Sequence, residues 1–401
     1  MTDKEFAEIK KRFKSDKGNI AYIRGCYVSA AKEIISRFKV PVNMLNDEQQ
    51  DWVLKLMKKS ISGAMGRNLM NIEFTTDQVE SGEEYKLLSD IRESELDNAE
   101  LLDALYEKIV SSFVTDGNYL ILLAYDRYDV PSFSKNDEDL MDSTEMFRYF
   151  ICSICPIKIT RAALGFSTGE NNFRNIGAES AVSAPEIGFM YPCFDDRKTN
   201  IYNAVFYTRS TKENYAEVVE ALFGAKAQMP AAEQKQAFRN VVSDSTSESR
   251  NLGFVQSVHS MISDMITEHK ESKDPEPLML DKNDVKRVLT TCGAKDEEMA
   301  SFDENFVNGF GEKIEIPPQN IIDPKQFELK NSYVSIKVDP KFSFMVDAKV
   351  VDGVKYIMIR ADEGVEVNGI GIHFDGEQLP QRVITDNEAA DTDSNTENTS
   401  E

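Results

Sequence analysis

Apolar residues recur at helical spacing in the first third of the chain. Thr2 and Glu5 form a capping box, which predicts a short helix that ends near Phe13. Asn46 precedes a second run in which apolar residues return every three or four positions, and residues 98–114 repeat this pattern. Each of these helices is expected to bury one apolar face.

Strand patterns dominate the middle of the chain. Runs rich in β-branched and aromatic residues are bounded by short polar links. The predicted strands occupy residues 19–28, 33–38, 119–128, 147–159, 186–194 and 200–209. The first two are expected to form a hairpin and the last two an antiparallel pair. Two polar segments, residues 134–144 and 165–183, are predicted to be loops or insertions.

Helical patterns return in the second half, followed by further strands. The predicted helices occupy residues 215–223, 231–243, 254–265, 282–291 and 296–308. The charged, proline-containing segment 268–277 is the best candidate for a linker. The dipeptides Asp352-Gly353 and Asn368-Gly369 each separate two short apolar runs. Both supply the positive φ angles that a two-residue type I′ hairpin requires.

These elements predict an α+β fold with a central antiparallel sheet, flanking helices and a small C-terminal α+β lobe. The predicted domains are an N-terminal hairpin and helices (1–115), a central α+β domain (116–270) and the C-terminal lobe (278–375). Residues 385–401 contain six acidic residues and no basic one. Such a segment cannot offset its ordering entropy, so we expect a disordered acidic tail.

Composition narrows the class of protein. The 401 residues carry a formal charge of −23, with 41% hydrophobic and 29% charged residues. No apolar run reaches the ~18 residues of a membrane span, and the charged N-terminus does not resemble a secretion signal. The five cysteines are an odd number spread over the chain, which does not indicate a disulfide framework. We therefore expect a soluble, cytoplasmic protein.

The charge is unevenly distributed. Residues 1–67 contain 14 Lys and Arg against 8 Asp and Glu, a net of +6, so the remainder carries −23 − 6 = −29. The densest basic run is Lys10, Lys11, Arg12, Lys14 and Lys17. Clustered cations of this kind bind nucleic-acid phosphates. A solvated basic surface is the alternative interpretation.

Few motifs point to catalysis. The chain lacks a GxSxG elbow, the GxxxxGK[ST] and GxGxxG phosphate loops, and an HExxH motif among its three histidines. Cys152 and Cys155 form an isolated CxxC inside a predicted strand, where positions i and i+3 point to opposite faces. We expect two buried structural cysteines, with no metal site and no cofactor.

The loop between the strands at 186–194 and 200–209 holds the densest group of charged side chains. Asp195 and Asp196 could hold a divalent cation, and Arg197 could bind a phosphate. A charged turn would use the same residues differently, with an aspartate accepting backbone N–H bonds and the arginine pairing with a carboxylate. Both interpretations stay open at this point.

The chain resembles an uncharacterised bacterial family of about 400 residues, a domain of unknown function. The resemblance spans nearly residues 1–372 and rests on six segments: IRGCYV, GNYLILLAYDRYDVP, CSICPIKIT, FDDRKTNIYNAVFYTR, EHKESKDPEPL and IRADEGVEVNGI. The order of elements between Tyr119 and Arg360 is also similar to the nucleoid-associated protein family of bacteria. That similarity includes the helix ending in LFGAKA, the helix AEQKQAFRNVVSD and the helix of Phe302 and Phe306.

These resemblances imply no particular activity, and they assign no binding residues. The leading hypothesis is a non-enzymatic cytosolic interaction protein with nucleoid association. An enzyme that acts on a phosphorylated or nucleic-acid substrate through Asp195–Arg197 is the alternative. A structural or partner-binding protein without a nucleic-acid role is the third hypothesis, and the sequence does not identify a partner.

Overall fold

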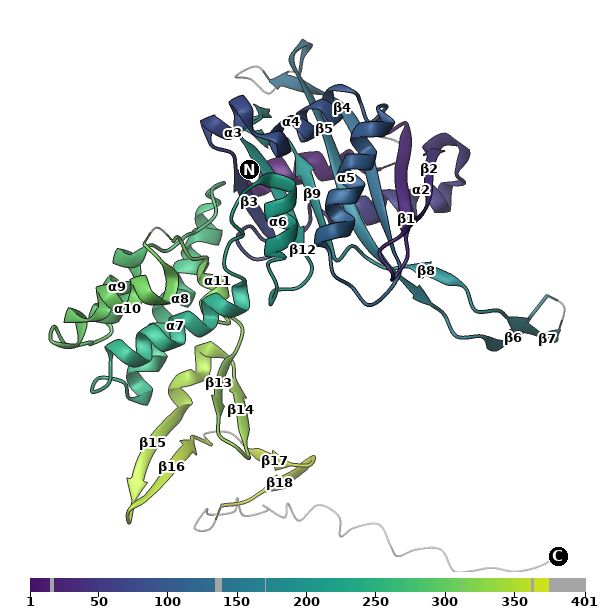
Figure 1. Cartoon of the computed structure of the whole chain (residues 1–401). Helices are drawn as coiled ribbons and strands as arrows, with labels where there is room; N and C mark the ends of the chain where they lie inside the picture. Colours follow the sequence, from purple (N-terminus) through teal and green to yellow (C-terminus); the bar gives the residue numbers. More distant parts are fainter. Residues whose placement is uncertain (15–17, 134–138, 170, 313, 362–363, 375–401) are drawn as a thin grey trace, which may run out of the picture. The chain divides into compact units, whose positions relative to one another are not determined.

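The α+β class is confirmed by a computed structural model (Figure 1). The structure describes residues 1–14, 18–133, 139–169, 171–312, 314–361 and 364–374. Lys17 and the predicted acidic tail lie outside these residues. Internal contacts divide the chain into two units, Met1–Ser343 and Phe344–Glu401.

An antiparallel sheet forms the centre of the first unit. Its main path runs β2-β1-β4-β5-β9-β12-β3, and every neighbouring pair is antiparallel. The strands are β1 (Tyr22–Val28), β2 (Ile34–Pro41), β3 (Leu69–Glu73), β4 (Tyr119–Phe133), β5 (Asp139–Ile159), β9 (Ile187–Tyr191) and β12 (Asn203–Thr208). The hairpin and the antiparallel pair expected from the sequence are both confirmed, whereas β3 was not predicted.

Helices cover both faces of this sheet because successive strand residues point to opposite sides. On β4, Ile121 and Leu123 belong to one hydrophobic cluster, and Leu122 and Ala124 belong to the other. The helices of this region are α1 (Asp3–Lys11), α2 (Asp47–Lys59), α3 (Thr76–Ser81), α4 (Glu83–Glu93), α5 (Ala99–Ser112) and α6 (Ala216–Phe223), with a short 3₁₀ helix, η1 (Val42–Met44).

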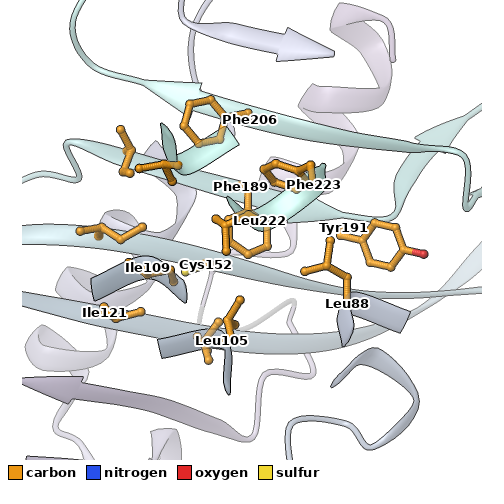
Figure 2. Close-up of a cluster of buried hydrophobic side chains, with 14 of the residues drawn as sticks. Leu88, Leu105, Ile109, Ile121, Cys152, Phe189, Tyr191, Phe206, Leu222 and Phe223 are labelled. Carbon is orange, nitrogen blue, oxygen red and sulfur yellow. The ribbon is translucent and has the colours of Figure 1, made fainter. Parts of the chain in front are cut away.

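The helices α4, α5 and α6 lie over the face to which Ile121 points (Figure 1). Figure 2 shows the side chains that fill this layer, with Leu105 and Ile109 of α5 and Phe223 of α6 against Phe189 and Cys152 of the sheet. The opposite layer contains the apolar residues of α1 and α2. Both N-terminal helices therefore pack on the same face of the sheet.

Gly188 allows the end of α2 to approach the sheet closely. A Cβ atom at this position would lie 2.3 Å from Oγ of Ser60 and 2.6 Å from the carbonyl oxygen of Cys152. Ser60 follows the last residue of α2, and its hydroxyl lies 2.7 Å from the Ser153 hydroxyl in a buried hydrogen bond. A side chain at 188 would push the helix away from β5 and β9.

Both segments predicted as loops contain strand. β5 begins at Asp139, inside segment 134–144. Segment 165–183 overlaps a hairpin of β6 (Ala163–Ser167) and β7 (Asn172–Ile176), and β8 (Ser180–Val182) pairs with β5. The loop interpretation was wrong, because these strands are held by backbone pairing, which Gly, Ser and Asn residues permit; the alternative, an insertion, is not contradicted. A ring contact across the hairpin, with Phe166 and Phe173 centroids 5.4 Å apart, adds to that pairing.

A helical lobe follows β12 and α6 in the chain. Its elements are α7 (Ala231–Ser245), α8 (Leu252–Ser272), α9 (Lys282–Thr291), η2 (Glu298–Ala300), α10 (Phe302–Phe310), α11 (Pro318–Ile321), β13 (Phe327–Lys330), β14 (Ser335–Val338) and η3 (Pro340–Met345). The first half of the predicted linker 268–277 is helical, since α8 continues to Ser272. The charged residues there form the solvated end of a long amphipathic helix whose buried stripe includes Phe254, Val258 and Ile262.

The second unit contains two hairpins, and both predicted turns are confirmed. β15 (Val346–Val351) pairs with β16 (Val354–Ile359), and β17 (Val365–Val367) pairs with β18 (Ile370–Ile372). Asp352 and Gly353 have φ angles of 51° and 79°, and Asn368 and Gly369 have 53° and 80°. All four angles are positive, as a type I′ turn requires. In β15, only Val346 is buried, so this ribbon has almost no core of its own.

Candidate functional site

The loop that suggested a metal or phosphate site is a tight hairpin turn. β10 (Cys193–Asp195) pairs with β11 (Lys198–Asn200), and Asp195 stands opposite Lys198. The two residues between them, Asp196 and Arg197, have φ angles of 49° and 58°. Aspartate tolerates the left-handed region better than most residues, and two such angles in succession are typical of a type I′ turn.

Contacts to the N-terminal helix engage the charged groups of this turn. The α-amino group of Met1 lies 2.6 Å from Oδ1 of Asp195, whose Oδ2 accepts a 2.7 Å hydrogen bond from Asn200. Burial alone would lower the pKa of this amine, but the hydrogen bond and charge of Asp195 outweigh burial, and the pKa is raised. Arg197 Nη2 lies 3.2 Å from Oε1 of Glu8 and donates a 2.8 Å hydrogen bond to the Pro131 carbonyl.

These contacts hold the turn against α1 and leave Asp195 and Arg197 with structural partners. Among the described residues, no group of three or more His, Cys, Asp and Glu side chains converges in a way that could hold a metal ion. The geometry therefore resembles the charged turn more closely than a cation site.

Arg12, the centre of the predicted basic run, is bound to a buried carboxylate. Its Nε lies 2.9 Å from Oδ2 of Asp126, and its Nη2 lies 3.1 Å from Oδ1. The Asp126 side chain is 1% exposed. Burial alone would lower the pKa of Arg12, but the hydrogen bonds and charge of Asp126 outweigh burial and raise it. Arg12 also lies over the ring of Tyr128, with 4.9 Å from Cζ to the centroid. These contacts make Arg12 part of the packing between α1 and the sheet.

The lysines near Arg12 have a different environment. Lys11 and Lys14 are exposed, and Lys10 is half-buried. Burial lowers the pKa of Lys10; the charge of Asp3 opposes this shift, and the nearby charge of Lys58 adds to it. Lys58 belongs to the last turn of α2, so the basic ends of α1 and α2 approach each other.

We call this set of side chains the lysine cluster. Its members are Lys10, Lys11, Lys14, Lys55, Lys58 and Lys59. None of them forms an ion pair with any residue that the structure describes. Sequence reasoning found the first three and missed the three of α2, because nothing local indicates that the ends of two helices about 45 residues apart meet on one sheet face.

An exposed tryptophan lies beside the lysines of α2. Trp52, the sole tryptophan of the chain, is 67% exposed. Lys55 and Lys59 follow at the i+3 and i+7 positions, so all three share the solvent face of the helix. The buried residues Leu54 and Met57 occupy the other side. The spacing of Trp52, Lys55 and Lys59 was visible in the sequence, but only the structure shows that the indole is exposed.

The cysteine pair lies where the sequence placed it. Cys152 contributes to one hydrophobic layer and Cys155 to the other, which confirms that they point to opposite faces of β5. Burial raises the pKa of Cys155 to about 12 and the pKa of Cys152 well above its ordinary value. Both side chains are therefore neutral thiols at physiological pH.

Residues 1–370 match a family model described as a domain of unknown function, DUF4317. The chain belongs to this family. No curated protein matches it. The DUF4317 match spans the sheet, the helical lobe and the second unit as far as residue 370, and its description assigns no activity. None of the helices in the described part of this DUF4317 chain has the length and apolar content that a membrane span requires.

Proposed function

We propose that the chain is a non-enzymatic interaction protein of the nucleoid-associated kind, which binds nucleic acid through the lysine cluster. The observation that carries the proposal is the set of six lysines at the converging ends of α1 and α2, none of which forms an ion pair within the described part of the chain. The rest of the chain is strongly acidic, with −29 beyond residue 67. An acidic surface repels a polyanion, so binding would be confined to this one region.

Electrostatics favours a phosphate backbone as the partner. The charge of Lys58 lowers the pKa of Lys10 and the charge of Asp3 raises it, while no described carboxylate forms an ion pair with either lysine. A row of phosphates would supply the missing counter-charges and release bound counterions. This gain in entropy is the main source of sequence-independent affinity for nucleic acids.

Trp52 adds a second kind of contact. Exposed aromatic rings stack on unpaired bases, and each such stack contributes about 1–3 kcal/mol. Lys55 and Lys59 lie on the same face of α2 and would contact the adjacent backbone. We therefore expect the affinity for single-stranded nucleic acid to depend on Trp52 as well as on the lysines, and the affinity for duplex to depend on the lysines alone.

The enzymatic alternative has less support. It requires Asp195, Asp196 and Arg197 to face a substrate, whereas Asp195 and Arg197 contact Met1 and Glu8 in the described structure. Asp196 is the one carboxylate of the turn that forms no ion pair with a described residue, and one carboxylate does not fill the coordination sphere of Mg²⁺ or Ca²⁺.

Fluorescence anisotropy with short labelled oligonucleotides, single-stranded and duplex, tests the proposal. The variant Lys55→Gln/Lys58→Gln/Lys59→Gln removes three charges from the cluster while keeping good helix-forming residues. We expect its affinity for both oligonucleotides to fall by about tenfold or more at low salt.

The matched control removes three exposed lysines elsewhere, Lys226→Gln/Lys270→Gln/Lys341→Gln, and changes the net charge equally. The control is expected to bind within about twofold of wild type, because these lysines lie outside the cluster. Equal losses in the two triple variants would show a net-charge effect and contradict the proposed site.

A further inference from the structure

A cleft in the helical lobe has the size of a small-molecule site. It lies between α7, α8 and the segment from α11 to β13, and has a volume of about 530 Å³. Ligand pockets for small molecules commonly range over about 300–1,000 Å³. The floor is apolar and formed by side chains that are nearly buried: Phe238, Phe254, Val258, Ile321, Ile322 and Phe327.

Cations occupy the rim of this cleft. Lys235 and Arg239 are one turn apart on α7, so their side chains project from the same face. Neither has an ion pair with a described residue. Arg250 lies at the same rim and donates a 2.9 Å hydrogen bond from Nη1 to the carbonyl of Ser243.

The two acidic residues of the lining are already hydrogen-bonded. Oδ1 of Asp323 accepts a 2.9 Å bond from the Lys325 amide, and Oε1 of Glu328 accepts a 2.9 Å bond from the Ser335 hydroxyl. Neither forms an ion pair with Lys235 or Arg239. These bonds leave both carboxylates charged, so the lining carries three cations, Lys235, Arg239 and Arg250, against two carboxylates, a net of 3 − 2 = +1.

His259 forms part of the wall rather than of the charged rim. Its Nε2 donates a 3.0 Å hydrogen bond to the Asp323 carbonyl, and its ring meets the edge of Phe327 with 5.4 Å between centroids. Burial lowers the pKa of His259, so the ring is neutral at physiological pH. His259 therefore adds no charge to the wall.

We propose that this cleft binds a small amphiphilic anion, with a carboxylate or phosphate head at Lys235 and Arg239 and an apolar body against Phe238, Phe254 and Val258. Two adjacent cations, neither of which forms an ion pair with a residue that the structure describes, favour an anionic head. A hydrocarbon or aromatic body that packs on the apolar floor is removed from water, which stabilises the complex. The site is independent of the lysine cluster, because it lies on different helices and uses different residues.

Isothermal titration calorimetry with decanoate, decyl phosphate and decyltrimethylammonium tests the assignment on the full chain. The three probes share an apolar chain and differ in the head. Both anions are expected to bind with one-to-one stoichiometry, and their relative affinities distinguish a carboxylate from a phosphate preference. The cationic probe is expected to bind at least about tenfold more weakly. Equal binding of all three would contradict an anion site.

Two variants locate the site. Lys235→Gln/Arg239→Gln should weaken both anions by about tenfold or more, while the matched pair Lys226→Gln/Lys270→Gln leaves them unchanged. Val255→Trp places a large side chain at a lining position that is 40% exposed, so it fills the cleft without disturbing the core and should abolish binding. Anion binding that survives both cleft variants would overturn the proposal, as would binding of an acidic amphipathic peptide in place of both small anions.

Discussion

Arg12 gives the sharpest test of how α1 is attached to the sheet. Oδ1 of Asp126 accepts hydrogen bonds from Arg12 and from the Asn19 amide (3.1 Å), and Oδ2 accepts from Arg12 and from the Tyr149 hydroxyl (3.0 Å). The Arg12→Met variant keeps much of the side-chain volume but leaves the carboxylate buried without this cation. Removing one partner of a buried ion pair costs about 3–5 kcal/mol.

The Arg12 side chain is 15% exposed, so water can partly replace it, and we expect a loss near the lower end, about 3 kcal/mol. With a urea m-value of about 3 kcal/mol/M, the unfolding midpoint should fall by about 1 M. Circular dichroism during urea titration measures this shift.

The double variant Arg12→Met/Asp126→Asn supplies the control. Asparagine carries no charge, its oxygen can accept from the Asn19 amide, and its Nδ2 can donate to the Tyr149 hydroxyl oxygen, so most of the lost stability should return. A cost below about 1 kcal/mol for Arg12→Met would place this contact among ordinary surface pairs and refute the reasoning. The same conclusion follows if the double variant is no more stable than the single one.

Three further predictions concern the sheet and its turns. Gly188→Ala should lower the free energy of unfolding by about 1–3 kcal/mol, because the new methyl group overlaps Ser60; an unchanged urea midpoint would contradict this close approach. Asp195→Asn/Asp196→Asn should cost about 0.5–2 kcal/mol. Thermal melting with and without millimolar Mg²⁺, Mn²⁺ or Ca²⁺ should show no metal-dependent rise, and a rise in wild type that disappears in the variant would favour the enzyme. Cys155 keeps its proton in the folded state up to a pKa of about 12 and loses it in the unfolded state above the ordinary value of 9.0, so its contribution to stability is lost as pH rises from 9 to 12. The decline should be shallower in Cys155→Ala.

Local sequence signals predicted the elements that local chemistry determines. The Asp352-Gly353 and Asn368-Gly369 turns are confirmed because both need positive φ angles that few other dipeptides supply. The capping box of Thr2 is also confirmed, as is the face alternation that separates Cys152 from Cys155. In each case the deciding interaction joins residues close in sequence.

The remaining features depend on partners far apart in the chain. In the sequence, Arg12 does not differ from the neighbouring lysines, because its partner Asp126 lies 114 residues later. The lysine cluster requires α1 and α2 to share a sheet face, which no local pattern encodes. The strands β6 and β7 are an exception, because they pair with each other in a local hairpin, and they were not predicted since their Gly, Ser and Asn residues resemble a loop.

The salt dependence of duplex DNA binding tests the proposed function most directly. Each lysine that neutralises a phosphate contributes about 0.9 to the slope of log K against log salt concentration. Wild type should show a steep slope, and the slope of Lys55→Gln/Lys58→Gln/Lys59→Gln should be smaller by about 2.7, since three contacts are removed. An identical slope in the two proteins, or no measurable binding by wild type at low salt, would contradict a nucleic-acid role for the lysine cluster.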